Sequence, residues 1–215
     1  MQRDLFEHRP EHARRAFAPG ALWLGGFARE REHQLLATIA AVVATTPFRQ
    51  MSTPGGRRMS VAMSNCGAFG WVTDARGYRY QPDDPLSGRP WPPMPGEFAA
   101  LAARAAAEAG HANFEPDACL VNRYEPGARM TLHQDVDERD FTQPIVSVSL
   151  GLPAVFLFGG AQRGDKAQRL PLVHGDVLVW GGPSRRCFHG VLPVKEGVHP
   201  LFGRCRINLT FRRAG

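Results

Sequence analysis

Several features that would set this chain apart from ordinary globular proteins are missing from its sequence. No apolar run approaches the roughly 18 to 20 residues that a membrane-spanning helix needs. No internal repeat or low-complexity tract is present, and the hydrophobic share of 43% over 215 residues excludes a disordered chain. Residues 1–17 mix acids with bases and lack a continuous apolar core, so we expect no secretory signal there.

Cysteine is scarce and unpaired along the chain. Its four cysteines show no CxxC spacing, which argues against both a disulfide framework and a zinc ribbon. We therefore expect a monomer in the reducing cytoplasm, without contact to a membrane. The net charge of +6 favours a polyanionic partner over a neutral one, although a basic solvated surface is the plain alternative.

Two helices and a series of short strands make up the expected secondary structure. Apolar residues at helical spacing predict helices over 28–46 and 96–110. From about residue 117, short apolar runs separated by glycine and proline turns predict the strands of a β-sandwich or barrel of jelly-roll type. The fold class that follows is α+β and mainly β.

We expect one domain, 1–215, built in three parts. Residues 12–46 would form an N-terminal helical support, and residues 96–215 a helix plus the jelly-roll core. The segment between them, 47–95, is rich in glycine and proline but also in aromatic and arginine residues. Such a long segment is typical of a lid, and its composition suits stacking on bases and contact with phosphates. The alternative is a cover whose aromatic side chains only pack on the core.

The stretch LHQDVDE, residues 132–138, places His133, Asp135 and Asp137 at every second position. On an extended strand these side chains share one face. Two imidazoles and one carboxylate on one face of an octahedron form the iron(II) site of non-haem oxygenases. We expect the second imidazole to be His189, in the strand-like run RCFHGV.

Other assignments stay open at this point. His174 and His199 are weaker rivals for the second imidazole because each lies beside a turn residue. Cys187 near His189 raises the possibility of zinc, which the absence of paired cysteines disfavours. A surface cluster without a metal is the plain alternative for the His-x-Asp pattern.

The C-terminal run RCRINLTFRR alternates polar and apolar residues. Its polar face carries Arg206, Asn208, Thr210 and Arg212. The two arginines are about 20 Å apart along a strand and can lean toward a small dicarboxylate, a group that arginine binds through two hydrogen bonds. Asn122 and Tyr124 share a face of the run LVNRY and would complete that pocket. The alternative is that RCRINLTFRR forms a half-exposed strand whose polar residues face water and bind nothing.

Taken together, these motifs resemble the AlkB family of 2-oxoglutarate- and iron(II)-dependent nucleic-acid dealkylases, from about residue 15 to Arg213. The similarity rests on PFRQMSTPGG, MSVAMSNCG, GWVTDARGYRY, FEPDACLVNRYEPGA, LHQDVDE, PIVSVSLGLPAVFLFGG, HGDVLVWGG and CRINLTFRRAG. It implies a double-stranded β-helix of jelly-roll type with flanking helices and a nucleotide-recognition lid. It also implies Fe(II), 2-oxoglutarate and O2 as cofactor and co-substrates.

The resemblance assigns roles to individual residues. The iron ligands would be His133, Asp135 and His189. The 2-oxoglutarate site would be Asn122, Tyr124, Arg206, Asn208 and Arg212, with Arg212 on the distal carboxylate. The substrate would contact Thr53, Met63, Trp71, Tyr78, Asp137 and Arg163. Of these, Thr53 and Tyr78 would contact phosphates, and Trp71 and His133 would lie beside the damaged base.

The implied activity is direct repair of alkylated DNA, preferably single-stranded, at 1-methyladenine and 3-methylcytosine. The same chemistry on RNA is an alternative, because no segment plainly reads the 2′-hydroxyl. A catalytically silent β-barrel and an oxygenase of protein side chains are weaker alternatives. One departure from the family is Val136, where a basic residue is expected beside the substrate groove.

Overall fold

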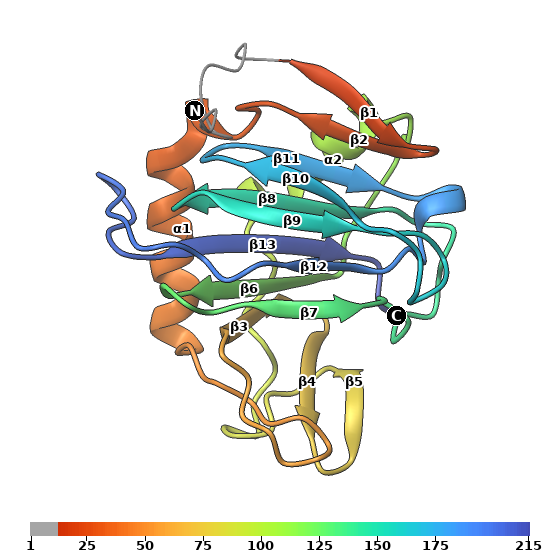
Figure 1. Cartoon of the computed structure of the whole chain (residues 1–215). Helices are drawn as coiled ribbons and strands as arrows, with labels where there is room; N and C mark the ends of the chain where they lie inside the picture. Colours follow the sequence, from red (N-terminus) through yellow and green to blue (C-terminus); the bar gives the residue numbers. More distant parts are fainter. Residues whose placement is uncertain (1–12) are drawn as a thin grey trace.

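The computed structural model describes residues 13–215 and places two β-sheets face to face (Figure 1). The larger sheet contains, in spatial order, β1 (Arg14–Ala18), β2 (Ala21–Leu24), β11 (Val177–Trp180), β8 (Ile145–Gly151), β13 (Arg206–Arg212), β6 (Ala118–Tyr124) and β3 (Ala62–Gly67). The smaller sheet contains β10 (Gln168–Leu172), β9 (Ala154–Phe158), β12 (His189–Val191) and β7 (Met130–His133).

The remaining elements lie outside these two sheets. They are the separate hairpin of β4 (Gly70–Asp74) and β5 (Gly77–Gln81), the helices α1 (Glu32–Thr45) and α2 (Gly96–Glu108), and the short 3-10 helices η1 (Arg29–Arg31) and η2 (Gly182–Ser184). Within the described residues, no helix has the length and apolar character needed to cross a membrane.

From β6 onward the chain passes repeatedly from one sheet to the other. Strands β6, β8, β11 and β13 lie in the larger sheet, and β7, β9, β10 and β12 lie in the smaller one, all in antiparallel pairs. This winding is the double-stranded β-helix of a jelly roll, so the predicted fold class is confirmed.

Two apolar layers hold the sheets and helices together. One layer packs α1 and α2 against the outer face of the larger sheet, through residues such as Leu35, Phe98 and Leu209. The other fills the space between the sheets, where Phe156 of β9 meets Trp180 of β11. Because the central strands of the larger sheet are covered on both faces, even their polar residues are buried.

The N-terminal support differs from the helical segment that the sequence predicts. Residues 14–24 form the hairpin β1–β2, which extends the larger sheet by pairing with β11. Helix α1 starts only at Glu32, because Arg29–Arg31 form a 3-10 turn. Residues 1–12, which include most of the segment tested for a secretory signal, lie outside the described residues.

The predicted lid segment also contains more regular structure than expected. Strand β3 belongs to the larger sheet, where it pairs with β6, so only part of residues 47–95 stands apart from the core. The β4–β5 hairpin projects beyond β3 (Figure 1). The side chain of Asn65 holds the start of β4 by accepting from the backbone N–H of Trp71 and donating to its carbonyl, both at 3.1 Å.

Candidate metal centre and two adjoining cavities

Three side chains meet between the two sheets with the chemistry of a metal site. His133 at the end of β7 and His189 at the start of β12 are paired directly across the smaller sheet. The ligand atoms of both histidines and of Asp135 all lie within 4.8 Å of one another. The carboxylate is 3.7 Å from Nε2 of His133 and 3.6 Å from Nε2 of His189.

Hydrogen bonds and burial hold these three groups in forms that can bind a metal ion. Nδ1 of His133 lies 2.9 Å from the carbonyl of Thr131, and Nδ1 of His189 lies 3.0 Å from the carbonyl of Cys187. A carbonyl accepts only from a protonated nitrogen, so these contacts favour the tautomer in which Nε2 carries the lone pair of the neutral ring. Burial lowers the pKa of His189 to about 4, which keeps this imidazole neutral.

Asp135 stays ionised in the same site. Burial alone would raise its pKa, but the charge of Arg212 holds it well below the usual range. Arg212 donates from Nη2 and Nε to Oδ2 of Asp135, at 2.6 and 2.9 Å, and leaves Oδ1 facing His133. An ionised carboxylate and two neutral imidazoles are the donor set that iron(II) oxygenases use, so these residues fit the metal.

The rival ligands lie elsewhere. His174 is buried in a separate cluster, where Nε2 lies 2.7 Å from Glu32 and Nδ1 accepts from the backbone of Gly151. The ring of His199 lies against that of His174, with centroids 4.4 Å apart and planes tilted by 30°. Cys187 contributes its carbonyl, not its sulfur, to the neighbourhood of the metal site. Among the described residues, the only group of three potential ligands is therefore the predicted one.

A narrow cavity of about 50 Å³ extends from the metal site into the space between the sheets. Its lining includes all five residues predicted to bind 2-oxoglutarate, namely Asn122, Tyr124, Arg206, Asn208 and Arg212. They converge because β13 pairs with β6 in a register that sets Asn208 opposite Asn122 and Arg206 opposite Tyr124. Oδ1 of Asn122 and Nη1 of Arg206 are buried there without a hydrogen-bond partner.

The two arginines of this cavity differ in what they already bind. Arg206 is 1% exposed, donates Nε–H to Ser149 at 3.0 Å, and lies over the ring of Tyr124. Burial lowers its pKa, and no carboxylate within residues 13–215 pairs with it. Arg212 instead lies beside the metal ligand Asp135, and the neighbouring carboxylates raise its pKa in spite of burial. An anion in this cavity would therefore give Arg206 the negatively charged hydrogen-bond partner that it lacks.

A wider cavity of about 450 Å³ adjoins the metal site and the narrow cavity. Its lining includes all six residues predicted to contact the substrate, namely Thr53, Met63, Trp71, Tyr78, Asp137 and Arg163. It also includes His133, Asp135 and Arg212, so the two cavities meet at the metal site. Val136, the departure from the family pattern, is 50% exposed at the same cavity.

The aromatic side of the wider cavity is held by several contacts. The rings of Trp71 and Tyr78 are stacked, with centroids 5.7 Å apart and planes 16° from parallel. Nε1 of Trp71 donates to Oδ2 of Asp137 at 2.8 Å. The β4–β5 hairpin therefore contributes a flat apolar surface to the cavity, and the carboxylate of Asp137 lies at the edge of that surface.

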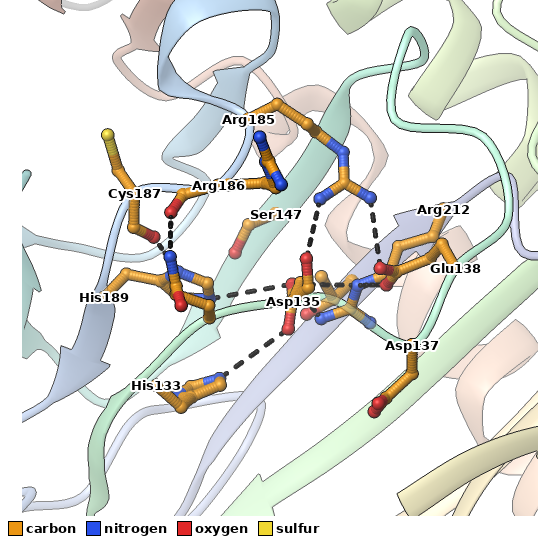
Figure 2. Close-up of polar contacts among 12 residues, drawn as sticks. His133, Asp135, Asp137, Glu138, Ser147, Arg185, Arg186, Cys187, His189 and Arg212 are labelled. Carbon is orange, nitrogen blue, oxygen red and sulfur yellow. Dashed lines mark hydrogen bonds and ion pairs between the residues drawn. The ribbon is translucent and has the colours of Figure 1, made fainter. Parts of the chain in front are cut away.

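Three residues that the sequence did not single out surround the metal ligands. Glu138 accepts from the hydroxyl of Tyr80 at 3.2 Å and lies 3.1 Å from Nε of Arg212. Arg185 lies 3.2 Å from Glu138 and donates to the backbone carbonyl of Asp135 at 3.1 Å (Figure 2). No local pattern marks these residues, because they come together from segments far apart in the chain.

Comparison with known proteins gives consistent matches. A family model described as the 2OG-Fe(II) oxygenase superfamily matches residues 20–212. The alpha-ketoglutarate-dependent dioxygenase AlkB of Escherichia coli is 56% identical over 212 residues, covering 99% of this chain and 98% of the relative. AlkB of Salmonella typhimurium is 57% identical over 197 residues, covering 92% and 91%. The solved structure of OsALKBH1 superposes with a TM-score of 0.82 at 29% identity, covering 94% of this chain and all of the other.

Replacing His189 by alanine tests the metal centre directly. Two remaining ligands cannot form the three-ligand face, so we expect Fe(II) affinity in an anaerobic titration to fall by more than the roughly 10- to 100-fold that loss of an outer-sphere partner costs. His199→Ala is the matched control because His199 belongs to the separate histidine cluster. Stoichiometric Fe(II) binding by His189→Ala, at native affinity, would contradict the assignment.

Proposed function

The chain belongs to the 2OG-Fe(II) oxygenase superfamily and to its AlkB family, and from this premise we propose that it repairs DNA by removing the methyl groups of 1-methyladenine and 3-methylcytosine. It is a 2-oxoglutarate-dependent dioxygenase that uses Fe(II), 2-oxoglutarate and O2. When bound, iron and 2-oxoglutarate would supply the chemistry by which O2 oxidises an N-methyl group, which leaves as formaldehyde while 2-oxoglutarate is oxidised to succinate and CO2.

The observation that carries this proposal is the meeting of two unlike cavities at one metal site. The narrow cavity contains two arginines and two asparagines among apolar side chains and suits a small dicarboxylate. The wider one has room for a base and is lined by aromatic, methionine and polar residues. His133, Asp135 and His189 would hold the iron between them, so co-substrate and substrate reach it from opposite sides.

Within the narrow cavity we assign the distal carboxylate of 2-oxoglutarate to Arg206. This differs from the assignment that the resemblance implied, which placed Arg212 there. Arg212 is engaged with Asp135 at the metal end, whereas Arg206 has a buried nitrogen without a partner. A carboxylate bound by Arg206 would satisfy that nitrogen, and Tyr124 and Asn122 would orient the molecule toward the iron.

The wider cavity would receive a base that has been turned out of the stack. A methyl group on the pairing edge is inaccessible inside a duplex, so the nucleotide must be flipped or already single-stranded. Trp71 and His133 supply rings on which the base can stack, and Asp137 presents a carboxylate at the edge. This carboxylate would attract the positive charge of 1-methyladenine and 3-methylcytosine and accept from their exocyclic amines.

The rest of the nucleic acid would cross the rim of this cavity. Thr53 and Tyr78 would contact phosphates, and Arg163 adds a cation on the opposite side. Val136 offers no charge to this rim, which supports weaker phosphate contact than a basic residue would give. The preference for single strands, the monomeric state and the cytoplasmic location stay predictions.

The decisive experiment measures formaldehyde and succinate released from matched methylated single-stranded DNA and RNA oligonucleotides. We expect equal amounts of the two products, dependent on Fe(II) and 2-oxoglutarate, with higher kcat/KM on DNA. A higher kcat/KM on RNA would transfer the proposal to the alternative substrate. Absence of formaldehyde from either substrate, with iron bound, would overturn it.

Replacing Arg206 by lysine tests the position of 2-oxoglutarate. The charge is retained but the planar pair of donors is lost, so we expect the KM for 2-oxoglutarate to rise roughly tenfold or more, since a hydrogen bond to a charged group contributes about 1.5 to 3 kcal/mol. DNA affinity should stay within about twofold. An unchanged KM for 2-oxoglutarate would show that the distal carboxylate lies elsewhere.

Replacing Asp137 by alanine tests the recognition of cationic bases. We expect rates on 1-methyladenine and 3-methylcytosine to fall about tenfold more than rates on 1-methylguanine and 3-methylthymine. Only the first pair carries a positive charge, and it has an amine at the position where the second pair has a carbonyl oxygen. Fe(II) binding and substrate-independent succinate formation should remain. Equal losses on all four bases would indicate instead that Asp137 only holds Trp71 in place.

A further inference from the structure

Two consecutive carboxylates contact two opposed residues of the β4–β5 hairpin. The register of the hairpin pairs Trp71 directly with Tyr80, so both side chains point to the same face. Trp71 donates to Asp137 at 2.8 Å, and Tyr80 donates to Glu138 at 3.2 Å. The first of these contacts lies in the substrate cavity, whereas neither Tyr80 nor Glu138 lines either cavity.

The contact between Tyr80 and Glu138 continues to the metal site. The oxygen of Glu138 that accepts from Tyr80 is also 3.1 Å from Nε of Arg212. Arg212 in turn binds Asp135 at 2.6 Å. On the far side of Glu138, Arg185 is 3.2 Å away and also holds the backbone of Asp135 (Figure 2). One hydroxyl of the hairpin is thus three contacts away from a metal ligand.

This group of charges is almost completely shielded from water. The side chain of Glu138 is 1% exposed and that of Arg185 is 3% exposed. Two carboxylates and two guanidinium groups balance one another there. In such surroundings a hydrogen bond is stronger than in water, and losing one partner leaves the others poorly compensated.

We propose that Tyr80 and Glu138 are positioning residues that fasten the β4–β5 hairpin to Arg212, so that seating of the hairpin over the substrate cavity and fixation of Arg212 against Asp135 occur together. The proposal rests on the proposed function, because it assumes that the hairpin covers a substrate and that Arg212 faces 2-oxoglutarate. It adds two residues that touch neither molecule and act through others.

Replacing Tyr80 by phenylalanine removes only the hydroxyl and keeps the ring. We expect amide hydrogen exchange of residues 70–81 to become about tenfold faster, because local opening loses a hydrogen bond to a buried charge. In turnover, the amount of succinate formed per formaldehyde should rise, since 2-oxoglutarate would be consumed while the hairpin is unseated. Thermal unfolding should show that the rest of the fold is retained.

Tyr78→Phe is the matched control, because Tyr78 lies on the same hairpin face but its hydroxyl has no contact with Glu138. This variant should change the KM for DNA and leave exchange of the hairpin as in the native protein. Faster exchange of similar size in both variants would overturn the proposal and indicate general loosening of the hairpin. Unchanged exchange and unchanged product ratio in Tyr80→Phe would overturn it as well.

The path through Glu138 is tested by Glu138→Gln and by the double variant. Glu138→Gln should raise both hairpin exchange and the KM for 2-oxoglutarate, because Arg212 loses its second carboxylate. If Tyr80 acts through Glu138, adding Tyr80→Phe to Glu138→Gln should produce little further change, and fully additive effects would contradict the path.

If Glu138→Gln fails to fold, the comparison of Tyr80→Phe with Tyr78→Phe still tests the proposal. Hydrogen exchange needs no nucleic acid, so this result is separate from failure of the proposed activity.

Discussion

Arg212 and Asp135 form a buried ion pair in which two guanidinium nitrogens reach one carboxylate oxygen. The pair joins β13, an interior strand of the larger sheet between β8 and β6, to the segment that follows β7 in the smaller one. Removing two charges from water costs several kcal/mol per ion, and this cost is offset only by close geometry and further partners. Glu138 and Arg185 supply those partners. The metal ligand is therefore ionised and oriented before any metal binds.

Strand β13 serves the core and the site with alternate residues. Ile207, Leu209 and Phe211 pack toward the helices, whereas the residues between them face the space between the sheets. Because the smaller sheet covers that second face, its polar groups are buried, and hydrogen bonds from Asn208 to Ser147 and from Arg206 to Ser149 satisfy part of them. Strand β13 thus contributes to both the core and the site, and both depend on the register of β13 with β6 and β8.

The metal site separates two kinds of recognition. The narrow cavity, lined by two arginines, would select a small anion by charge and shape. The wider cavity, bounded by a hairpin outside both main sheets, would admit a flat ring. The hairpin is held near its base at the pair Trp71–Tyr80, by Asn65 through the backbone and by two consecutive carboxylates through the side chains. The side-chain contacts that hold the hairpin thus lead to the same few charges that hold Asp135.

Local patterns in the sequence were sufficient for the helix of residues 96–108, for β6 and β13, and for the sharing of one face by His133 and Asp135. These features depend on periodicity, which neighbouring residues determine by themselves. Only the tertiary structure shows that His189, and not His174, lies beside His133 and Asp135, that β1 and β2 join the larger sheet, and that Glu138 lies between Tyr80 and Arg212. Such contacts join residues that are tens of positions apart. They depend on strand register and on the packing of one sheet against the other, and no local pattern encodes either.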